Sequence, residues 1–166
     1  VGVSPTMQPM VDPGLLEHVE LFVELGPDAI ARVAAVAEAR ELRRGDVLFE
    51  EGDEPAELFV VLSGRIAMLN RSFDGRESVL ALMERGDLFG EMPLFDNLPR
   101  SADARALENS DVIAIPYAPL RQIYEERPAL LWAVTAMLAG RLRSMDEALA
   151  DSVFLDVTGR TAKRLL

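Results

Sequence analysis

Residues 43–66 read RRGDVLFEEGDEPAELFVVLSGRI, and this stretch alternates short apolar runs with turns that contain glycine. The same alternation continues through further apolar runs at residues 66–69, 78–83 and 112–115. Glycine supplies the positive φ that tight turns require, and Asp74-Gly75 between two of the runs is a strong hairpin signal. Closely spaced turns between β-prone runs indicate an antiparallel sandwich or barrel.

Helical periodicity flanks this β region on both sides. Apolar residues recur at three- and four-residue spacing over residues 12–38, and Pro27 falls where it can begin a second short helix. After the β region, Pro119 can begin a short helix and Pro128 a longer one. We therefore expect a mainly β fold with short N-terminal helices and a long C-terminal helix.

Seven residues of the expected long helix follow one another at spacings of 4, 3, 4, 3, 4 and 3 residues and so form one stripe, which we call the seam. The seam consists of Leu131, Thr135, Leu138, Leu142, Met145, Leu149 and Ser152. This is the heptad spacing of a coiled coil, and it predicts a parallel homodimer. The alternative is that the stripe packs on the sheet of its own chain.

Composition excludes several classes of function. The chain has 166 residues, a net charge of −11, a single histidine and no cysteine. The acidic excess disfavours direct contact with a nucleic-acid backbone, and one histidine without cysteine cannot build a thiolate or multi-histidine metal site. Residues 1–11 lack a signal-peptide pattern, and the longest apolar stretch, 129–140, is too short for a membrane span. We expect a cytoplasmic protein with no cofactor, no metal and no membrane association.

Residues 89–106, FGEMPLFDNLPRSADARA, contain the groups suited to a ligand. Gly90 allows close backbone approach, Glu91 can accept a hydrogen bond from a sugar hydroxyl, and Met92 begins a predicted helical turn whose N–H groups can face an anion. Arg100 and Ser101 supply a guanidinium fork and a hydroxyl for phosphate oxygens. The alternative is a solvated loop in which Glu91 and Arg100 pair only with each other.

This segment closely resembles the phosphate-binding cassette of cyclic-nucleotide-binding domains. The resemblance extends through RRGDVLFEEGDEPAELFVVLSGRI and, further on, through FLDVTGRTAKRLL to the catabolite activator (CRP/FNR) family of bacterial transcription regulators. It covers residues 15–166 and implies a jelly-roll-like antiparallel β-roll (a double-stranded β-helix), a homodimer and a cyclic nucleotide as allosteric ligand. In that family a winged helix-turn-helix domain binds DNA, and the present chain stops at Leu166, where that domain would begin.

The resemblance also assigns roles to individual residues. Glu91 would bind the ribose with Gly90 and Met92 beside it, and Arg100 and Ser101 would hold the cyclic phosphate. The remaining ligand positions are apolar walls at Leu80, Met83 and Phe89, a basic residue at Arg141, and base-facing positions at Met145 and Asp146. The last two depart from the family, which has hydroxyl or amide side chains there.

We therefore expect four segments: a disordered N-terminus over residues 1–11, a β-roll with flanking helices over 12–126, a dimerisation helix over 127–154, and a hinge over 155–166. The expected function is that of a non-catalytic sensor domain that binds a cyclic nucleotide, with cAMP as the expected ligand. A degenerate domain that dimerises without a nucleotide is the alternative. A cupin-type enzyme is disfavoured because one histidine cannot supply its metal site.

Overall fold

The computed structural model describes residues 11–164, with side chains from residue 11 to residue 150. The chain divides into two compact units, of which the first ends at Pro128 and the second begins at Ala129. Apart from Val11, which is buried, the segment expected to be disordered lies outside the described residues.

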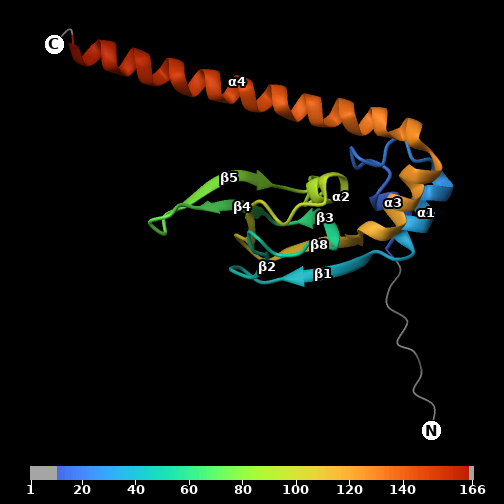
Figure 1. The fold of residues 1–166 in the computed structure, drawn as a ribbon. Helices are drawn as coiled ribbons and strands as arrows, with labels where there is room; N and C mark the ends of the chain where they lie inside the picture. Colours follow the sequence, from blue (N-terminus) through green and yellow to red (C-terminus); the bar gives the residue numbers. More distant parts are fainter. Residues whose placement is uncertain (1–10, 165–166) are drawn as a thin grey trace. The chain divides into compact units, whose positions relative to one another are not determined.

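The first unit is a β-roll made of two antiparallel sheets, as the sequence predicts (Figure 1). One sheet has the order β1 (Glu38–Leu42), β8 (Ser110–Pro116), β3 (Glu57–Ser63) and β6 (Leu88–Phe89). The other has the order β2 (Val47–Phe49), β7 (Asp103–Ala106), β4 (Ile66–Arg71) and β5 (Glu77–Met83). The expected hairpin joins β4 to β5, and Gly75 at its tip has a φ of 81°.

An apolar core fills the space between the sheets, because alternate residues of each strand point inward. Phe49, Phe59 and Phe89 form an aromatic cluster in this core, with the rings of Phe59 and Phe89 stacked 5.4 Å apart. The small side chains of Ala104, Ala106 and Ala114 make room for these rings; Val61, Ile66 and Val112 complete the buried set. The aromatic cluster forms the floor beneath residues 89–106, where Arg100 lies over the Phe49 ring.

Helices cover one end of the roll, where α1 (Pro27–Ala34) and α3 (Tyr117–Glu126) lie side by side (Figure 1). Pro27 begins α1 as predicted. The expected helix before it is instead a 3₁₀ turn, η1 (Pro13–Leu15), followed by turns that bury Leu16, Val19 and Phe22. Helix α3 begins at Tyr117, two residues before Pro119, because proline is tolerated in the first turn.

The second unit contains the long helix α4 (Leu131–Arg164), preceded by the 3₁₀ turn η2 (Pro128–Leu130). The helix continues beyond residue 154, so its backbone has no break where the hinge is expected. Among the described residues, no helix combines the length and the apolar character that crossing a membrane requires.

Candidate anion-binding site

The segment of residues 89–106, which the sequence predicts to bind a ligand, changes direction at Gly90. Its φ is 76°, a left-handed conformation that favours glycine, and it leads through Glu91 into the single helical turn α2 (Met92–Asp96). Asn97 ends this turn in the left-handed conformation, with a φ of 57°. The Oδ1 atom of Asn97 accepts a hydrogen bond from Arg121 of α3, at 2.8 Å. Helix α3 therefore fixes the end of the segment that begins at Gly90.

The guanidinium of Arg100 lies behind this turn and is almost entirely buried, with 6% of the residue exposed. Its Nη1 atom donates to the carbonyl oxygen of Gly90 at 3.0 Å and to the hydroxyl of Tyr117 at 3.1 Å. Its Nη2 atom donates to the carbonyl oxygen of Glu57 at 2.6 Å. These contacts link the segment to strand β3 and to the start of α3.

Aromatic and glycine positions shape the space around this guanidinium. The Cζ atom of Arg100 lies 4.0 Å from the centroid of the Phe49 ring, a cation–π arrangement. A Cβ atom on Gly90 would lie 2.7 Å from Nη1 of Arg100, so only glycine leaves enough room there. The guanidinium is therefore fixed between the aromatic core and the backbone of the turn.

The acidic run between β2 and β3 supports the main chain of Arg100. Glu50 and Asp53 close a tight turn in which Gly52 donates to the carbonyl oxygen of Arg100 at 2.8 Å, while Arg100 N donates to that of Asp53 at 3.0 Å. The buried carboxylate of Asp103 anchors the same loop by accepting from Glu51 N at 2.7 Å. The run is therefore a structural turn that holds Arg100 in place.

Arg100 forms no salt bridge within the described part of the chain. Two half-buried arginines of the β-roll pair with carboxylates: Arg40 with Glu57 and Arg105 with Glu77. None of the salt bridges that the described residues form involves Arg100. A buried cation is costly unless an anion compensates it. The site is therefore suited to an anionic ligand.

Three polar residues near Arg100 in the sequence or the fold differ in their exposure. Glu91 is buried with 5% exposure and precedes α2, whereas Ser101 is exposed. Burial raises the pKa of the Tyr117 phenol above its ordinary value, although the nearby Arg100 charge opposes this, so the hydroxyl stays protonated at neutral pH. Tyr117 donates its proton to the carbonyl oxygen of Gly90. The predicted Gly90, Glu91, Arg100 and Ser101 are thus gathered around one turn.

The predicted apolar walls occupy different environments. Leu80 on β5 and Met92 on α2 are exposed, and Met83 is half-buried against the core. Phe89 is 2% exposed and belongs to the aromatic cluster, so it supports the floor instead of presenting a face to solvent.

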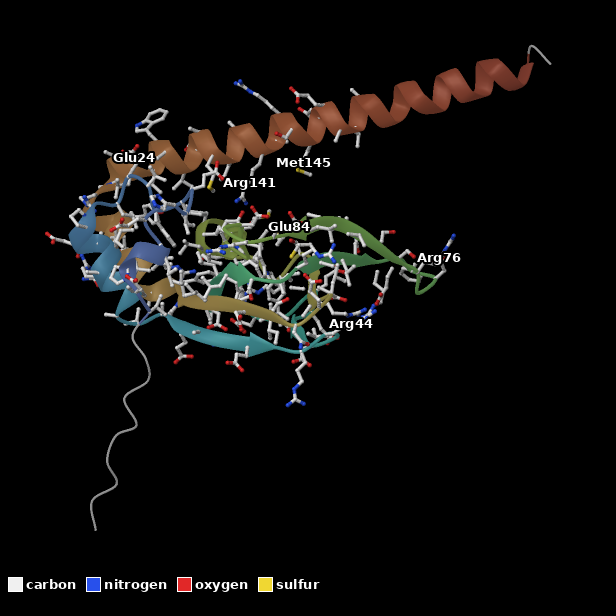
Figure 2. The ribbon with its side chains drawn as sticks, turned by 180° about the vertical axis from the view of Figure 1, so that it is seen from behind. Glu24, Arg44, Arg76, Glu84, Arg141 and Met145 are labelled. Carbon is white, nitrogen blue, oxygen red and sulfur yellow. The ribbon has the colours of Figure 1, made fainter. Side chains whose placement is uncertain are left out.

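The remaining predicted ligand residues belong to α4, in the second unit. Arg141 and Met145, four residues apart, project from the same side of the helix (Figure 2). Met145 and its neighbour Asp146 are exposed. The seam residues described with side chains are also exposed: Leu131, Thr135, Leu138, Leu142, Met145 and Leu149.

Sequence reasoning missed three contributors to the site: the Tyr117 hydroxyl, the Phe49 ring and the Glu57 carbonyl oxygen. Phe49 appears in the sequence only as part of an apolar run, and a backbone carbonyl leaves no signal at all. Tyr117 lies 17 residues after Arg100, and no spacing rule connects the two.

Comparison with known proteins identifies the family. The cyclic nucleotide-binding domain family matches residues 39–127, which include both the β-roll and the Arg100 site. The chain belongs to this family.

Its relatives are regulators of the CRP/FNR type. The chain is 34% identical over 152 residues to the CRP-like cAMP-activated global transcriptional regulator of Mycobacterium tuberculosis, covering 92% of this chain and 68% of that protein. It is 35% identical over 120 residues to the cAMP-activated global transcriptional regulator CRP of Escherichia coli O6:H1, covering 72% of this chain and 57% of that protein. The crystal structure of Thermus thermophilus catabolite activator protein matches with a TM-score of 0.66 and 32% identity, covering 78% of this chain and 61% of that one.

These findings confirm the expected fold and family. The chain is a CRP/FNR-type cyclic-nucleotide-binding domain, a binding domain and not an enzyme. It spans between about half and two thirds of the length of these regulators.

Proposed function

We propose that the site around Arg100 binds the cyclic phosphate of cAMP. The observation that carries the proposal is the buried guanidinium of Arg100, which no salt bridge among the described residues neutralises. A cyclic phosphodiester carries a single negative charge and two exocyclic oxygens, which match one guanidinium in charge and geometry. The names of the mycobacterial and enterobacterial relatives, both cAMP-activated, support this ligand.

The other residues of the segment complete the proposed site. Ser101 donates its hydroxyl to a phosphate oxygen beside Arg100, and Glu91 accepts a hydrogen bond from the ribose. The exposed Leu80 and the half-buried Met83 of β5 supply apolar contacts to the nucleotide.

Residues of helix α4 are proposed to contact the base of the nucleotide. Arg141 is proposed to orient towards the nucleotide, with Met145 packing on the base. Asp146, an acceptor when ionised, would accept from the exocyclic amine of adenine. Helix α4 is also proposed to form the homodimer through its exposed seam.

In the whole protein, we propose that nucleotide binding controls a DNA-binding domain. The acidic net charge of −11 disfavours DNA contact by this chain itself. The resemblance to the CRP/FNR family assigns DNA binding to a winged helix-turn-helix domain, which we propose to lie C-terminal to Leu166. The protein would then act as a cytoplasmic transcription regulator.

The second candidate is a degenerate domain that dimerises without binding a nucleotide. The departure from the family at Met145 and Asp146 favours it, because neither residue offers the hydroxyl that relatives present to the base. The buried Arg100 and Glu91 argue against it, since burying charged groups has a cost that an empty structural domain need not bear.

Calorimetric titration with cAMP tests the proposal. The wild-type chain should bind cAMP and should bind 5′-AMP, whose phosphate carries more charge, less tightly. Arg100→Ala should lose about 2–5 kcal/mol of binding free energy, because it removes one partner of a buried charged pair. Ser101→Ala should lose about 1 kcal/mol and should fold normally, because the exposed Ser101 is not part of the core.

The matched control is Arg105→Ala on β7, which removes an arginine already paired with Glu77. It should leave cAMP affinity unchanged. Absence of cAMP binding in a folded, dimeric wild-type chain would establish the degenerate domain instead.

A further inference from the structure

The phenol of Tyr117 occupies a central place in the site that the proposed function does not use. Its hydroxyl accepts from Nη1 of Arg100 at 3.1 Å and donates to the carbonyl oxygen of Gly90, which also accepts from the same Nη1 at 3.0 Å. Tyr117, Arg100 and Gly90 therefore form a closed triangle of hydrogen bonds. Each member fixes the other two.

The triangle determines which edge of the Arg100 guanidinium remains for a ligand. The group has five N–H donors; Nη1 donates to two acceptors of the protein, the Gly90 carbonyl oxygen and the Tyr117 hydroxyl, and Nη2 donates to one, the Glu57 carbonyl oxygen. The described residues supply no hydrogen-bond acceptor for Nε–H or for the second Nη2–H. Because no buried side-chain nitrogen among these residues lacks a partner, Nε must be reachable by solvent. Nε and Nη2 lie on the edge from which arginine binds two oxygens of one phosphate.

The triangle also orients the peptide that joins Gly90 to Glu91. The carbonyl oxygen of Gly90 points to Tyr117 and Arg100, and the described peptide bonds are all trans. In a trans peptide the N–H points away from the C=O, so Glu91 N–H is directed away from Tyr117. One hydroxyl thus fixes both a guanidinium and a backbone N–H.

Tyrosine meets a requirement here that phenylalanine cannot meet. The hydroxyl must donate and accept at once, and burial keeps it protonated by raising its pKa. The position of the ring is fixed independently, because Tyr117 begins α3 and its backbone N–H donates to the carbonyl oxygen of Ala56 at 2.9 Å. Removing only the hydroxyl therefore leaves the fold intact and takes away one of the three acceptors that hold the Arg100 guanidinium, while the carbonyl oxygens of Gly90 and Glu57 remain.

We propose that Tyr117 is a positioning residue for the phosphate: its hydroxyl holds Arg100 so that the Nε and Nη2 edge meets two exocyclic oxygens of the ligand. This inference rests on the proposed function, because it assigns the orientation of Arg100 towards the cyclic phosphate. Tyr117 itself does not touch the ligand.

The test compares Tyr117→Phe with Tyr124→Phe, the same substitution on the same helix. Tyr124 is buried, its hydroxyl lies 3.4 Å from the carbonyl oxygen of Leu21, and it makes no contact with Arg100. Calorimetry uses cAMP and the two phosphorothioate epimers in which sulfur replaces one or the other exocyclic oxygen. A guanidinium held in one orientation should bind the two epimers with different affinities, whereas a mobile guanidinium should bind them equally.

Tyr117→Phe should lower cAMP affinity about tenfold, the equivalent of about one hydrogen bond to a charged group, and should bring the affinity ratio of the epimers close to one. Tyr124→Phe should keep both the affinity and the ratio. An unchanged ratio in Tyr117→Phe would overturn the inference, even if affinity falls, because that result describes a general loss of structure.

Nitrogen-15 NMR of the arginine side chains provides a second measurement that needs no ligand. Arg100 in the wild-type chain should show hindered rotation of its Nη groups, and Tyr117→Phe should release it. Free rotation in the wild type, or hindered rotation in both chains, would contradict the triangle. If the wild type shows hindered rotation but binds no cyclic nucleotide, the proposed function fails and the phosphate role of Tyr117 fails with it, while the triangle stands.

Discussion

The Cζ atom of Arg100 lies 4.0 Å from the centroid of the Phe49 ring, closer than to the ring of Phe59, at 5.8 Å. Phe49 itself is buried and packs against Phe59 and Phe89 with ring centroids 5.8 and 6.2 Å away. The face of a core side chain is thus the surface on which the cation of the proposed site rests. Stability of the core and affinity for the ligand therefore share one residue.

Phe49→Leu should reduce both properties. The variant should lose about 1–2 kcal/mol of unfolding free energy in urea, because leucine fills the space of the ring incompletely. Its cAMP affinity should fall about three- to tenfold, because the ring no longer supports the guanidinium. The control is Phe22→Leu, which removes a buried ring before α1. Equal losses of cAMP affinity in the two variants would show that Phe49 acts only through global stability.

Gly90→Ala should be more harmful than alanine at another glycine with positive φ. Both Gly90 (φ 76°) and Gly75 (φ 81°) hold a left-handed conformation that costs an alanine about 1–2 kcal/mol. A Cβ atom at Gly75 meets nothing within 4 Å, whereas at Gly90 it meets Nη1 of Arg100 at 2.7 Å. Urea unfolding should therefore show a larger loss for Gly90→Ala, and only that variant should lose cAMP affinity. Equal stability losses would contradict the close packing of Gly90 on Arg100.

The five apolar runs of the sequence predict β2, β3, β4, β5 and β8, whereas β1, β6 and β7 are missed. Residues 38–42, Glu-Ala-Arg-Glu-Leu, have a helical composition, yet they form β1 because β8 offers them a partner edge. β7, Asp-Ala-Arg-Ala, has small inward side chains because the aromatic cluster fills the space opposite them. Tertiary pairing thus overrides local propensity at both positions.

The site shows the same division between local and distant information. Gly90, Glu91, Arg100 and Ser101 are close in sequence, so a motif can predict them together. Tyr117 and Glu57 reach Arg100 only because β3 and β8 are neighbours and α3 follows β8 directly. No local pattern encodes that topology, and the orientation of Arg100 therefore had to come from the structure.

Stability should fall at alkaline pH because of Tyr124. Burial raises its pKa from 10.0 to about 12, so the folded chain keeps a protonated phenol that the unfolded chain ionises above pH 10. The stabilisation is present below pH 10 and is lost as the pH rises towards 12, by roughly 2–3 kcal/mol. Urea unfolding at several pH values measures the slope of the unfolding free energy against pH. Tyr124→Phe should reduce the slope and leave the smaller contribution of Tyr117, whose pKa burial also raises; an unreduced slope would refute the assignment.

The seam of α4 should hold the chain as a dimer. Leu138 and Leu142 are exposed in the single chain, and two copies would bury them against each other. Replacing both by glutamate should give a monomer in sedimentation at tens of micromolar. The control pair, Ala136→Glu with Ser144→Glu, adds the same charge to the opposite side of the helix and should remain dimeric. A monomeric wild-type chain, or a dimeric Leu138→Glu/Leu142→Glu chain, would exclude the seam as the interface.

Asp146 should make the domain prefer adenine over guanine. An ionised carboxylate only accepts hydrogen bonds, and the exocyclic amine of adenine can donate to it, whereas guanine presents a carbonyl oxygen at the corresponding position. Met145 can pack on a base but cannot read its edge, which leaves Asp146 as the group that distinguishes the two. A satisfied charged hydrogen bond against an unsatisfied one should separate cAMP from cGMP by roughly 1–3 kcal/mol, or about 5- to 150-fold in affinity. The Asp146→Ala variant should bring this ratio close to one, while Glu147→Ala, which removes the neighbouring carboxylate, should not. Because only the ratio of the cAMP and cGMP affinities is compared, a general loss of affinity cannot imitate the result. If Asp146→Ala leaves this ratio unchanged, Asp146 does not determine base specificity, even if both nucleotides bind well.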